Sequence, residues 1–232
     1  MVEDLKRGFV DIHCHLLPGL DDGPATEAEA LEMAHVLASA GFSEVYCTPH
    51  MLRGAYDNPP AKVRQAVTVL QASLDRESIP LKLHPGMEYY LDEYLPAHLE
   101  DPLPLGDTPF LLVEASPQAN PDFLLDSIYQ VARRKLTPVL AHPERCETFH
   151  REKDFFSKLR AMGCLFQANI GSFAGVYGET VQHQSIQYLK QGTYDRVGTD
   201  AHRFKDFDRW LKAGMKWIPT EMAASVKGCA HA

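Results

Sequence analysis

The stretch FVDIHCH, residues 9–15, decides the fold because an apolar segment of β-strand length leads directly into two histidines separated by one residue. Alternate residues of a strand point to the same side, so His13 and His15 can both reach one ion. Parallel α/β folds carry their functional sites at the carboxyl ends of the strands. The segment therefore predicts the first strand of such a fold, with a site at its end.

Outward from this segment, apolar stretches of strand length alternate with helical patterns. Further strands are expected at 44–48, 81–88, 110–114, 137–142, 165–169 and 196–200. Helices are expected between Thr26 as N-cap and Gly41, from Asn120 as N-cap to 135, and at 61–77, 153–162, 184–190 and 206–213. Alternation of this kind implies a parallel sheet, and seven units suit either a barrel or a doubly wound sheet.

The composition excludes several classes of protein. The 232 residues include 23 Lys and Arg against 31 Asp and Glu, for a net charge of −8, which argues against a nucleic-acid or anionic-membrane partner. No apolar run approaches the roughly 18 residues of a membrane span, and the first residues, MVEDLKRG, lack the apolar core of a secretion signal. The five cysteines include no CxxC pair, which favours the reducing cytoplasm.

Imidazoles and carboxylates gather at the ends of the expected strands. Beyond the first strand, candidates occur at six strand ends and in the loop at 21–22: Asp21, Asp22, His50, Glu88, Glu114, His142, Asn169, Asp200 and His202. Each motif alone is common by chance, but the joint pattern is not. Nitrogen and oxygen ligands without thiolates suit Mn²⁺, Fe²⁺ or Zn²⁺. The candidates outnumber the three or four protein ligands of a mononuclear catalytic site, so two or three ions are expected.

The motifs DIHCH, LDDG, TPH, GME, VE, AHPER and GTDAH occur in this order between residues 9 and 204. Together they resemble the PHP (polymerase and histidinol phosphatase) family. LPGLDDGP, the run from His50 to Asn58 and HPER resemble its bacterial capsular-polysaccharide tyrosine phosphatase branch. The resemblance implies a distorted (β/α)7 TIM-like barrel, an α/β fold that forms one domain over residues 1–232. The weakly patterned tail after residue 220 is expected to fray.

The resemblance also implies three divalent ions, with manganese the usual one and iron or zinc compatible. The implied ligand sets are His13, His15, Glu88 and Asp200 for the first ion, Glu88, Glu114 and His142 for the second, and Asp22, His50 and His202 for the third. Asp22 is preferred because it matches the second Asp of the motif, which leaves Asp21 as a loop or capping residue. Arg145 of HPER would bind phosphate, with Arg53 and Arg203 as helpers. His202 is also a candidate to protonate the leaving group.

The expected activity is hydrolysis of a phosphomonoester. The branch implies phosphotyrosine on a protein, the tail of a bacterial tyrosine autokinase that controls exopolysaccharide export, as the cytoplasmic substrate. Homo-oligomerisation is compatible with the resemblance. However, the C-terminus TEMAASVKGCAHA lacks the Asn-Pro signature of the branch, so contacts of its last helix are not implied.

Three other interpretations remain open at this point. Another branch of the family hydrolyses histidinol phosphate or other small phosphoesters, and a metal-loaded regulatory module without activity would carry the same ligands. Cys47 and Arg53 also satisfy the Cys-x5-Arg spacing of thiol-based tyrosine phosphatases. That chemistry needs a cradle of free N–H groups, which is disfavoured by Pro49 and by the bulky Met51 and Leu52.

Overall fold

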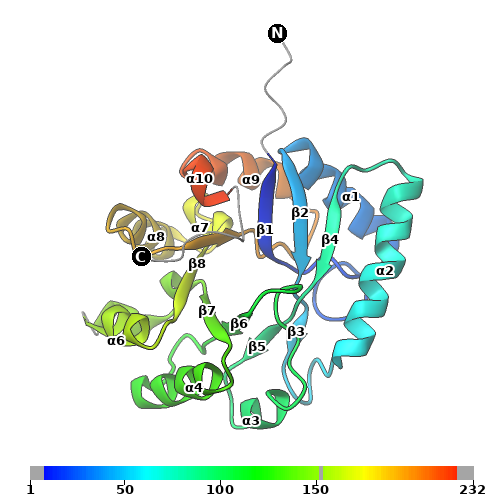
Figure 1. Cartoon of the computed structure of the whole chain (residues 1–232). Coiled ribbons are helices and arrows are strands. Elements are labelled where there is room, and N and C mark those ends of the chain that lie inside the picture. Colours follow the sequence, from blue (N-terminus) through cyan, green and yellow to red (C-terminus); the bar gives the residue numbers. More distant parts are fainter. Residues whose placement is uncertain (1–7, 152–153, 224–232) are drawn as a thin grey trace.

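Strands lie at the centre of the fold and helices cover their outer side in the computed structural model, which describes residues 8–151 and 154–223 (Figure 1). The strands are β1 (Phe9–Cys14), β2 (Phe42–Cys47), β3 (His50–Met51), β4 (Lys82–Pro85), β5 (Glu88–Tyr90), β6 (Phe110–Glu114), β7 (Thr137–Ala141), β8 (Leu165–Asn169) and β9 (Arg196–Gly198). The helices are α1 (Glu27–Ser39), α2 (Pro60–Arg76), α3 (Leu95–His98), α4 (Pro121–Arg133), α5 (Glu147–Arg151), α6 (Phe155–Ala161), α7 (Ile170–Phe173), α8 (Glu179–Lys190), α9 (Phe207–Met215) and α10 (Thr220–Ala223), with a 3-10 turn, η1, at Pro143–Arg145.

All the strand pairs are parallel, and they form two sheets with the orders β1-β2-β4 and β3-β5-β6-β7-β8-β9. The sheets adjoin at β1 and β9, where Cys14 and Ala201 form a parallel bridge and the amide of Asp200 donates to the carbonyl of His13 at 2.7 Å. At the other junction, β3 continues the line of β2, and β5 continues that of β4. The strands therefore follow one another in a circuit, which confirms the predicted α/β fold of barrel type.

The expected strand at 81–88 is two strands, because the chain breaks at Gly86. A Cβ at Gly86 would lie 2.8 Å from Leu105 Cδ2 and 3.1 Å from Thr48 Cγ2, so a larger residue would require these side chains to shift. The Gly86 amide still donates to Cys47, but the Glu88 amide donates to Pro49, beyond the end of β2. The break thus carries the chain from the first sheet to the second and sets Glu88 at the start of β5.

Two hydrophobic clusters separate the inside of the circuit from its outside. The smaller cluster contains buried residues of β1, β2, β6 and β7 and of the loop before β6, but none from a helix: Val10, Ile12, Tyr46, Leu105, Leu112, Val139 and Ala141. The larger cluster joins the alternate strand residues to the helices, for example Leu111 and Leu140 to Leu124 and Ile128 of α4. Because strand residues alternate in direction, the smaller cluster fills the interior below the site.

The helix boundaries follow local capping chemistry. Thr26 Oγ1 accepts the amide of Glu29, and Asn120 Oδ1 accepts two amides at the start of α4, which confirms both predicted N-caps. Helix α8 begins at Glu179, five residues earlier than predicted, because its first turn is polar and gives no apolar period. The short helices α3, α5, α7 and α10 were not predicted, since four or five residues are too few to show one.

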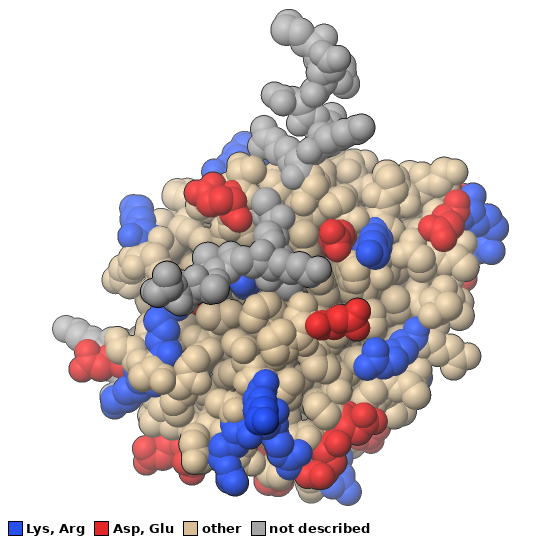
Figure 2. All heavy atoms as spheres, viewed as in Figure 1, with Lys and Arg blue, Asp and Glu red and all other residues tan. Residues whose placement is uncertain are grey.

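Within the part of the chain that is described, no helix is long and apolar enough to cross a bilayer. On the face shown in Figure 2, Lys and Arg occur in small groups interspersed with Asp and Glu. Of the C-terminal tail, residues 220–223 form α10, and the remainder of the expected frayed segment lies outside the described residues.

Candidate metal centre

The most buried polar group of the rim consists of two imidazoles and two carboxylates. His13 Nε2 lies 3.2 Å from Glu88 Oε2 and 3.3 Å from Asp200 Oδ1. His15 Nε2 lies 3.3 Å from each of the same two oxygens. All four side chains are buried, and their ligand atoms lie close enough to share one ion. The structure thus brings together the set expected for the first ion.

A bulge in β1 directs both histidines into this group. Three steps along β1, from Asp11 to Cys14, pair with only two steps of β2, so β1 contains one extra residue. The extra residue changes which side the following residues face, and the histidines therefore lie above Val10 and Ile12 of the interior cluster. The spacing of the two histidines is visible in the sequence, whereas the bulge that aims them is not.

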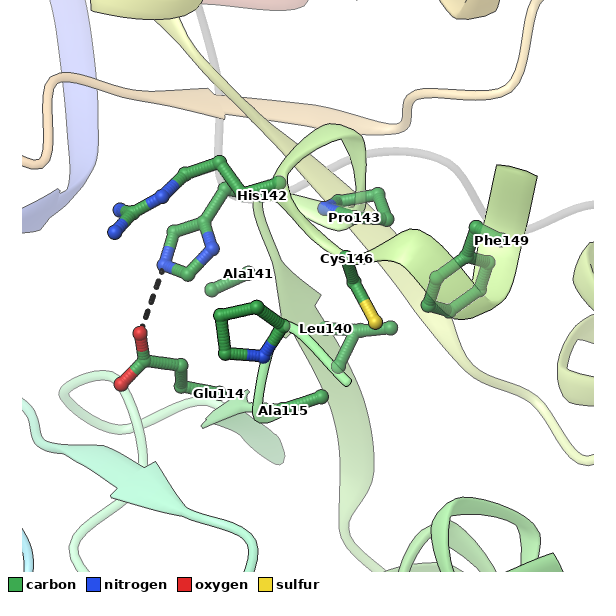
Figure 3. Close-up of a pocket in the computed structure, with 10 residues that line it drawn as sticks. Glu114, Ala115, Leu140, Ala141, His142, Pro143, Cys146 and Phe149 are labelled. Carbon is green, nitrogen blue, oxygen red and sulfur yellow. Dashed lines mark ion pairs between the residues drawn. The ribbon is translucent and has the colours of Figure 1, made fainter. Parts of the chain in front are cut away.

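Glu88 also contacts a second set of side chains. Its Oε2 lies 3.0 Å from His50 Nδ1, and its Oε1 lies 3.3 Å from His142 Nε2. Glu114 is 3.6 Å from the same nitrogen of His142, the pair joined by a dashed line in Figure 3, and 3.8 Å from His50. In the second predicted set, Glu88 and Glu114 each lie near His142 Nε2, but the side chains whose ligand atoms lie close enough to share an ion are Glu88, Glu114 and His50.

The third group lies at the more exposed mouth of the site. Asp22 Oδ1 is 3.6 Å from His50 Nε2 and 3.4 Å from His202 Nε2, and the Asp22 side chain is 46% exposed. The His202 ring stacks on that of His15 at 3.8 Å. These four side chains also lie close enough to share an ion. His202 Nδ1 is 2.9 Å from the Asp200 carbonyl, to which it donates, so Nε2 keeps its lone pair for a cation.

One atom at the centre of these groups has no hydrogen-bond partner among the described residues. Glu88 Oε2 is fully buried and makes no hydrogen bond, although three imidazole nitrogens surround it at 3.0–3.3 Å. Burial and the charge of Glu88 also raise the pKa of Glu114 to about 7. Buried carboxylates at such short separations are stabilised by cations, and the donor set, imidazole and carboxylate without thiolate, is one that Mn²⁺, Fe²⁺ and Zn²⁺ accept. The residues therefore fit a cluster of divalent ions.

Two of these side chains are presented by strained backbone. His142 has φ +33° and Asp200 has φ +53°, in the left-handed region that non-glycine residues rarely adopt. Each follows the end of a strand, β7 or β9, and the unusual conformation turns the side chain inward. Gly198 assists, because a Cβ at this position would lie 2.5 Å from the Cβ of His13. Such strain persists only where the surrounding structure enforces it, and it concentrates at functional sites.

The three predicted arginines are placed differently from one another. Arg145 Nη1 donates to Asp200 Oδ2 at 2.9 Å, and its guanidinium stacks on the Tyr177 ring at 4.5 Å, beside the buried groups. The guanidinium of Arg53 lies over the ring of Tyr94 at 4.2 Å, on an exposed hairpin. Arg203 is exposed. Of the three, the structure joins only Arg145 directly to a side chain of the candidate metal-binding groups.

Sequence reasoning missed two acidic residues that hold the site in place. Asp21 does accept a loop amide, from Gly23, as a capping residue would, but its other oxygen accepts His15 Nδ1 at 2.7 Å and the His50 amide at 3.0 Å. Glu144 of HPER is buried and accepts from Ser172 and from the amide of Asn169. In both cases the available signal was a carboxylate next to a predicted ligand motif. The sequence does not show where such a side chain points.

The cysteine that fits the thiol-phosphatase spacing is unsuited to nucleophilic attack. Cys47 is the last residue of β2, is fully buried and belongs to the larger hydrophobic cluster. Burial raises the pKa of its thiol far above the usual range, so the thiolate that such chemistry needs is not formed. The structure therefore favours the metal-binding groups over Cys47 as the reacting centre.

Comparison with known proteins adds to this geometry. A family model described as "Capsular polysaccharide synthesis, CpsB/CapC" matches residues 9–227. The chain is 33% identical over 199 residues to tyrosine-protein phosphatase YwqE of Bacillus subtilis, covering 85% of this chain and 78% of YwqE. It is 26% identical over 206 residues to the putative tyrosine-protein phosphatase CapC of Staphylococcus aureus, covering 88% and 81%.

Solved structures show the same relationship. The chain matches one from a study of YwqE from B. subtilis and CpsB from Streptococcus pneumoniae, described as unique metal-dependent tyrosine phosphatases, with a TM-score of 0.83, 30% identity and coverage of 94% and 88%. It also matches histidinol phosphate phosphatase from Lactococcus lactis, solved with zinc, L-histidinol and phosphate, with a TM-score of 0.54, 13% identity and coverage of 90% and 93%. At that identity the second likeness concerns the fold alone.

Proposed function

The chain belongs to the capsular polysaccharide synthesis CpsB/CapC family, and from this premise we propose that it is a metal-dependent phosphatase of phosphotyrosine in proteins. The observation that carries the proposal is the convergence of five histidine and four acidic side chains at one rim, where Glu88 Oε2 is buried among three imidazole nitrogens. The inactive regulatory alternative is less well supported, because each candidate ligand named from the sequence reaches this one rim.

In the proposal three divalent ions, with manganese the preferred one, occupy the three groups. His13, His15, Glu88 and Asp200 hold the first; Glu88, Glu114 and His142 hold the second, with His50 beside it; Asp22, His50 and His202 hold the third. When bound, such ions would supply charge for the phosphoryl oxygens and would lower the pKa of water towards ~7, which makes it a better nucleophile. Because the Nε2 lone pair of His202 faces Asp22, its proposed role is that of a ligand rather than an acid.

Arg145 is the proposed phosphate-binding cation of the chain. Its guanidinium is held by Asp200 and Tyr177 at the edge of the buried groups, so its charge is placed before substrate arrives. The leaving tyrosinate, with a pKa of ~10, needs little protonation, which relieves the site of a dedicated acid. The proposed substrate is the phosphorylated tail of a bacterial tyrosine autokinase, dephosphorylated in the cytoplasm.

The discriminating experiment compares two substrates at saturating Mn²⁺. We expect kcat/KM for a phosphotyrosine peptide to exceed that for histidinol phosphate by at least about 100-fold, because the alkoxide is the poorer leaving group and needs an acid. Steady-state assays of released phosphate measure both. The reverse preference would assign the chain to the small-phosphoester alternative, and no turnover of either substrate by metal-loaded protein would favour the regulatory module.

Replacing Arg145 tests its assigned role. We expect Arg145→Ala to lower kcat/KM for the peptide by about 10²–10³-fold, the usual loss when one preorganised donor to a developing charge is removed. Arg145→Lys should recover part of the loss, since lysine restores the charge without the planar fork. Arg53→Ala and Arg203→Ala serve as controls with smaller effects. If Arg53→Ala lowered kcat/KM as much as Arg145→Ala does, phosphate binding would be assigned to Arg53 of the hairpin instead.

A further inference from the structure

Strand β8 contributes no histidine or acidic side chain to the metal-binding groups, yet two of its amides lie beside them. Gln167 and Asn169 are two residues apart, so they point to the same side, and both are fully buried. Gln167 Oε1 lies 2.9 Å from His13 Nδ1. Asn169 Nδ2 lies 2.6 Å from Asp200 Oδ2. The two amides therefore contact His13 Nδ1 and Asp200 Oδ2, while the other atoms of the same two side chains, His13 Nε2 and Asp200 Oδ1, lie 3.3 Å from each other.

The two side-chain amides are also hydrogen-bonded to each other, and these hydrogen bonds determine which atom of each amide is the nitrogen and which is the oxygen. Gln167 Nε2 donates to Asn169 Oδ1 at 2.9 Å and to the Ala168 carbonyl at 2.6 Å. Both partners are acceptors, so the nitrogen of the Gln167 amide must face them and its oxygen must face His13. An amide oxygen only accepts, and His13 Nδ1 must therefore carry the proton. The Nε2 atom of His13 is left with a lone pair directed at Glu88 and Asp200.

The other end of this chain of bonds fixes the carboxylate. Asp200 Oδ2 accepts from Asn169 Nδ2, from Arg145 Nη1 at 2.9 Å and from the Tyr177 hydroxyl at 3.2 Å. Three donors occupy this oxygen, so Oδ1 is the atom that faces His13 and His15. Every bond from His13 to Asp200 runs in one direction, with the donor on the His13 side at each step. The charge of Asp200 thus polarises the whole chain.

We propose that Gln167 and Asn169 act as an amide relay, that is, as positioning residues which set the tautomer of His13 and the orientation of Asp200 together. The inference rests on the proposed metal site and deepens it. A partner that accepts from the distal nitrogen of a histidine ligand raises the basicity of the ligating nitrogen and holds the ring in place. The relay would raise the basicity of His13 Nε2 and would direct Oδ1 of Asp200 towards the same point. Both ligand atoms would then be in position before an ion binds.

Manganese binding tests the relay without reference to catalysis. The protein is titrated with MnCl₂, and the free aquo ion is measured by electron paramagnetic resonance. We expect Gln167→Met, which keeps the volume but cannot accept a hydrogen bond, and Asn169→Leu each to raise the dissociation constant of the tightest site by about 10–100-fold. In the double variant, the dissociation constant should rise by much less than the product of the two single increases, because either change alone interrupts the same chain of hydrogen bonds.

A matched control is available at Gln71 of α2. Its amide accepts the Leu83 amide at 2.8 Å and donates to the Leu81 carbonyl at 3.1 Å, so Gln71→Met removes the same kind of bonds at the α2–β4 packing. This variant should bind manganese as the unaltered chain does. Thermal unfolding of each variant verifies its fold. Gln167→Asn, an amide one methylene shorter that cannot reach His13, is the second relay variant should Gln167→Met not fold.

Activity at saturating Mn²⁺ distinguishes the relay from a purely structural role of the two amides. Relay variants should regain most of the kcat of the unaltered chain as manganese is raised, whereas a damaged fold would not respond. Affinity of Gln167→Met or Gln167→Asn equal to that of Gln71→Met would overturn the relay alone. An increase in the dissociation constant of the double variant equal to the product of the two single increases would also overturn the relay, because it would show that the two amides act independently. Failure of the unaltered chain to bind manganese would overturn the relay and the proposed function together.

Discussion

Removal of divalent ions with excess EDTA, followed by gel filtration, is expected to abolish hydrolysis of a phosphotyrosine peptide, and Mn²⁺ is expected to restore it. Among the described residues, no other group of this site can perform the reaction: Arg145 supplies charge but no nucleophile, and water whose pKa is not lowered is a poor one. Phosphate release measured before chelation, after it and after stepwise addition of Mn²⁺, Fe²⁺ or Zn²⁺ tests this and ranks the metals.

The control for this experiment is Cys47→Ser. The thiol is buried at the end of β2, so the variant should lose little activity and should respond to EDTA and Mn²⁺ as the unaltered chain does. Activity that survives complete removal of metal, verified by elemental analysis, and disappears in Cys47→Ser would transfer the reaction to the thiol and refute the metal-dependent mechanism.

The second large effect is expected at Glu88, the side chain shared by the first two groups. Glu88→Gln keeps the shape but removes one negative charge from among His13, His15, His50 and His142. As a ligand shared by two ions, the carboxylate of Glu88 would not be replaced by an amide, which offers one neutral oxygen. A loss of several kcal/mol in transition-state stabilisation corresponds to a fall in kcat of about 10³-fold or more. Bound manganese per chain, measured by elemental analysis, should fall as well.

A control for Glu88→Gln is Glu44 of β2, a glutamate that pairs with a histidine outside the site. Glu44 Oε2 is 2.7 Å from His84 Nε2, a histidine–carboxylate pair whose Glu44 side chain is 40% exposed. Exposed pairs of this kind contribute at most about 1 kcal/mol, so Glu44→Gln should leave kcat and metal content nearly unchanged. Full metal content together with full activity in Glu88→Gln would show that Glu88 is not a bridging ligand.

Much of this architecture could be predicted from the chain because it depends on local patterns. The segment 110–114, FLLVE, is an apolar run of strand length, and the structure has strand β6 at those residues. The caps Thr26 and Asn120 act within three residues of themselves. The break at Gly86 could not be predicted in this way, because it depends on Leu105 and Thr48, which are distant in the sequence.

The sequence by itself determined that His13 and Asp200 stand near strand ends, since a parallel α/β order brings those ends to one rim, whereas Glu88 is the first residue of β5 and reaches the rim through the break at Gly86. Only the tertiary structure decided how they face one another. The β1 bulge, the positive φ of His142 and Asp200, and the bonds from Asp21 and Gln167 all join residues that are separated in the chain or depend on backbone conformation. Side-chain direction at the end of a strand is set by such long-range packing, which no local periodicity encodes.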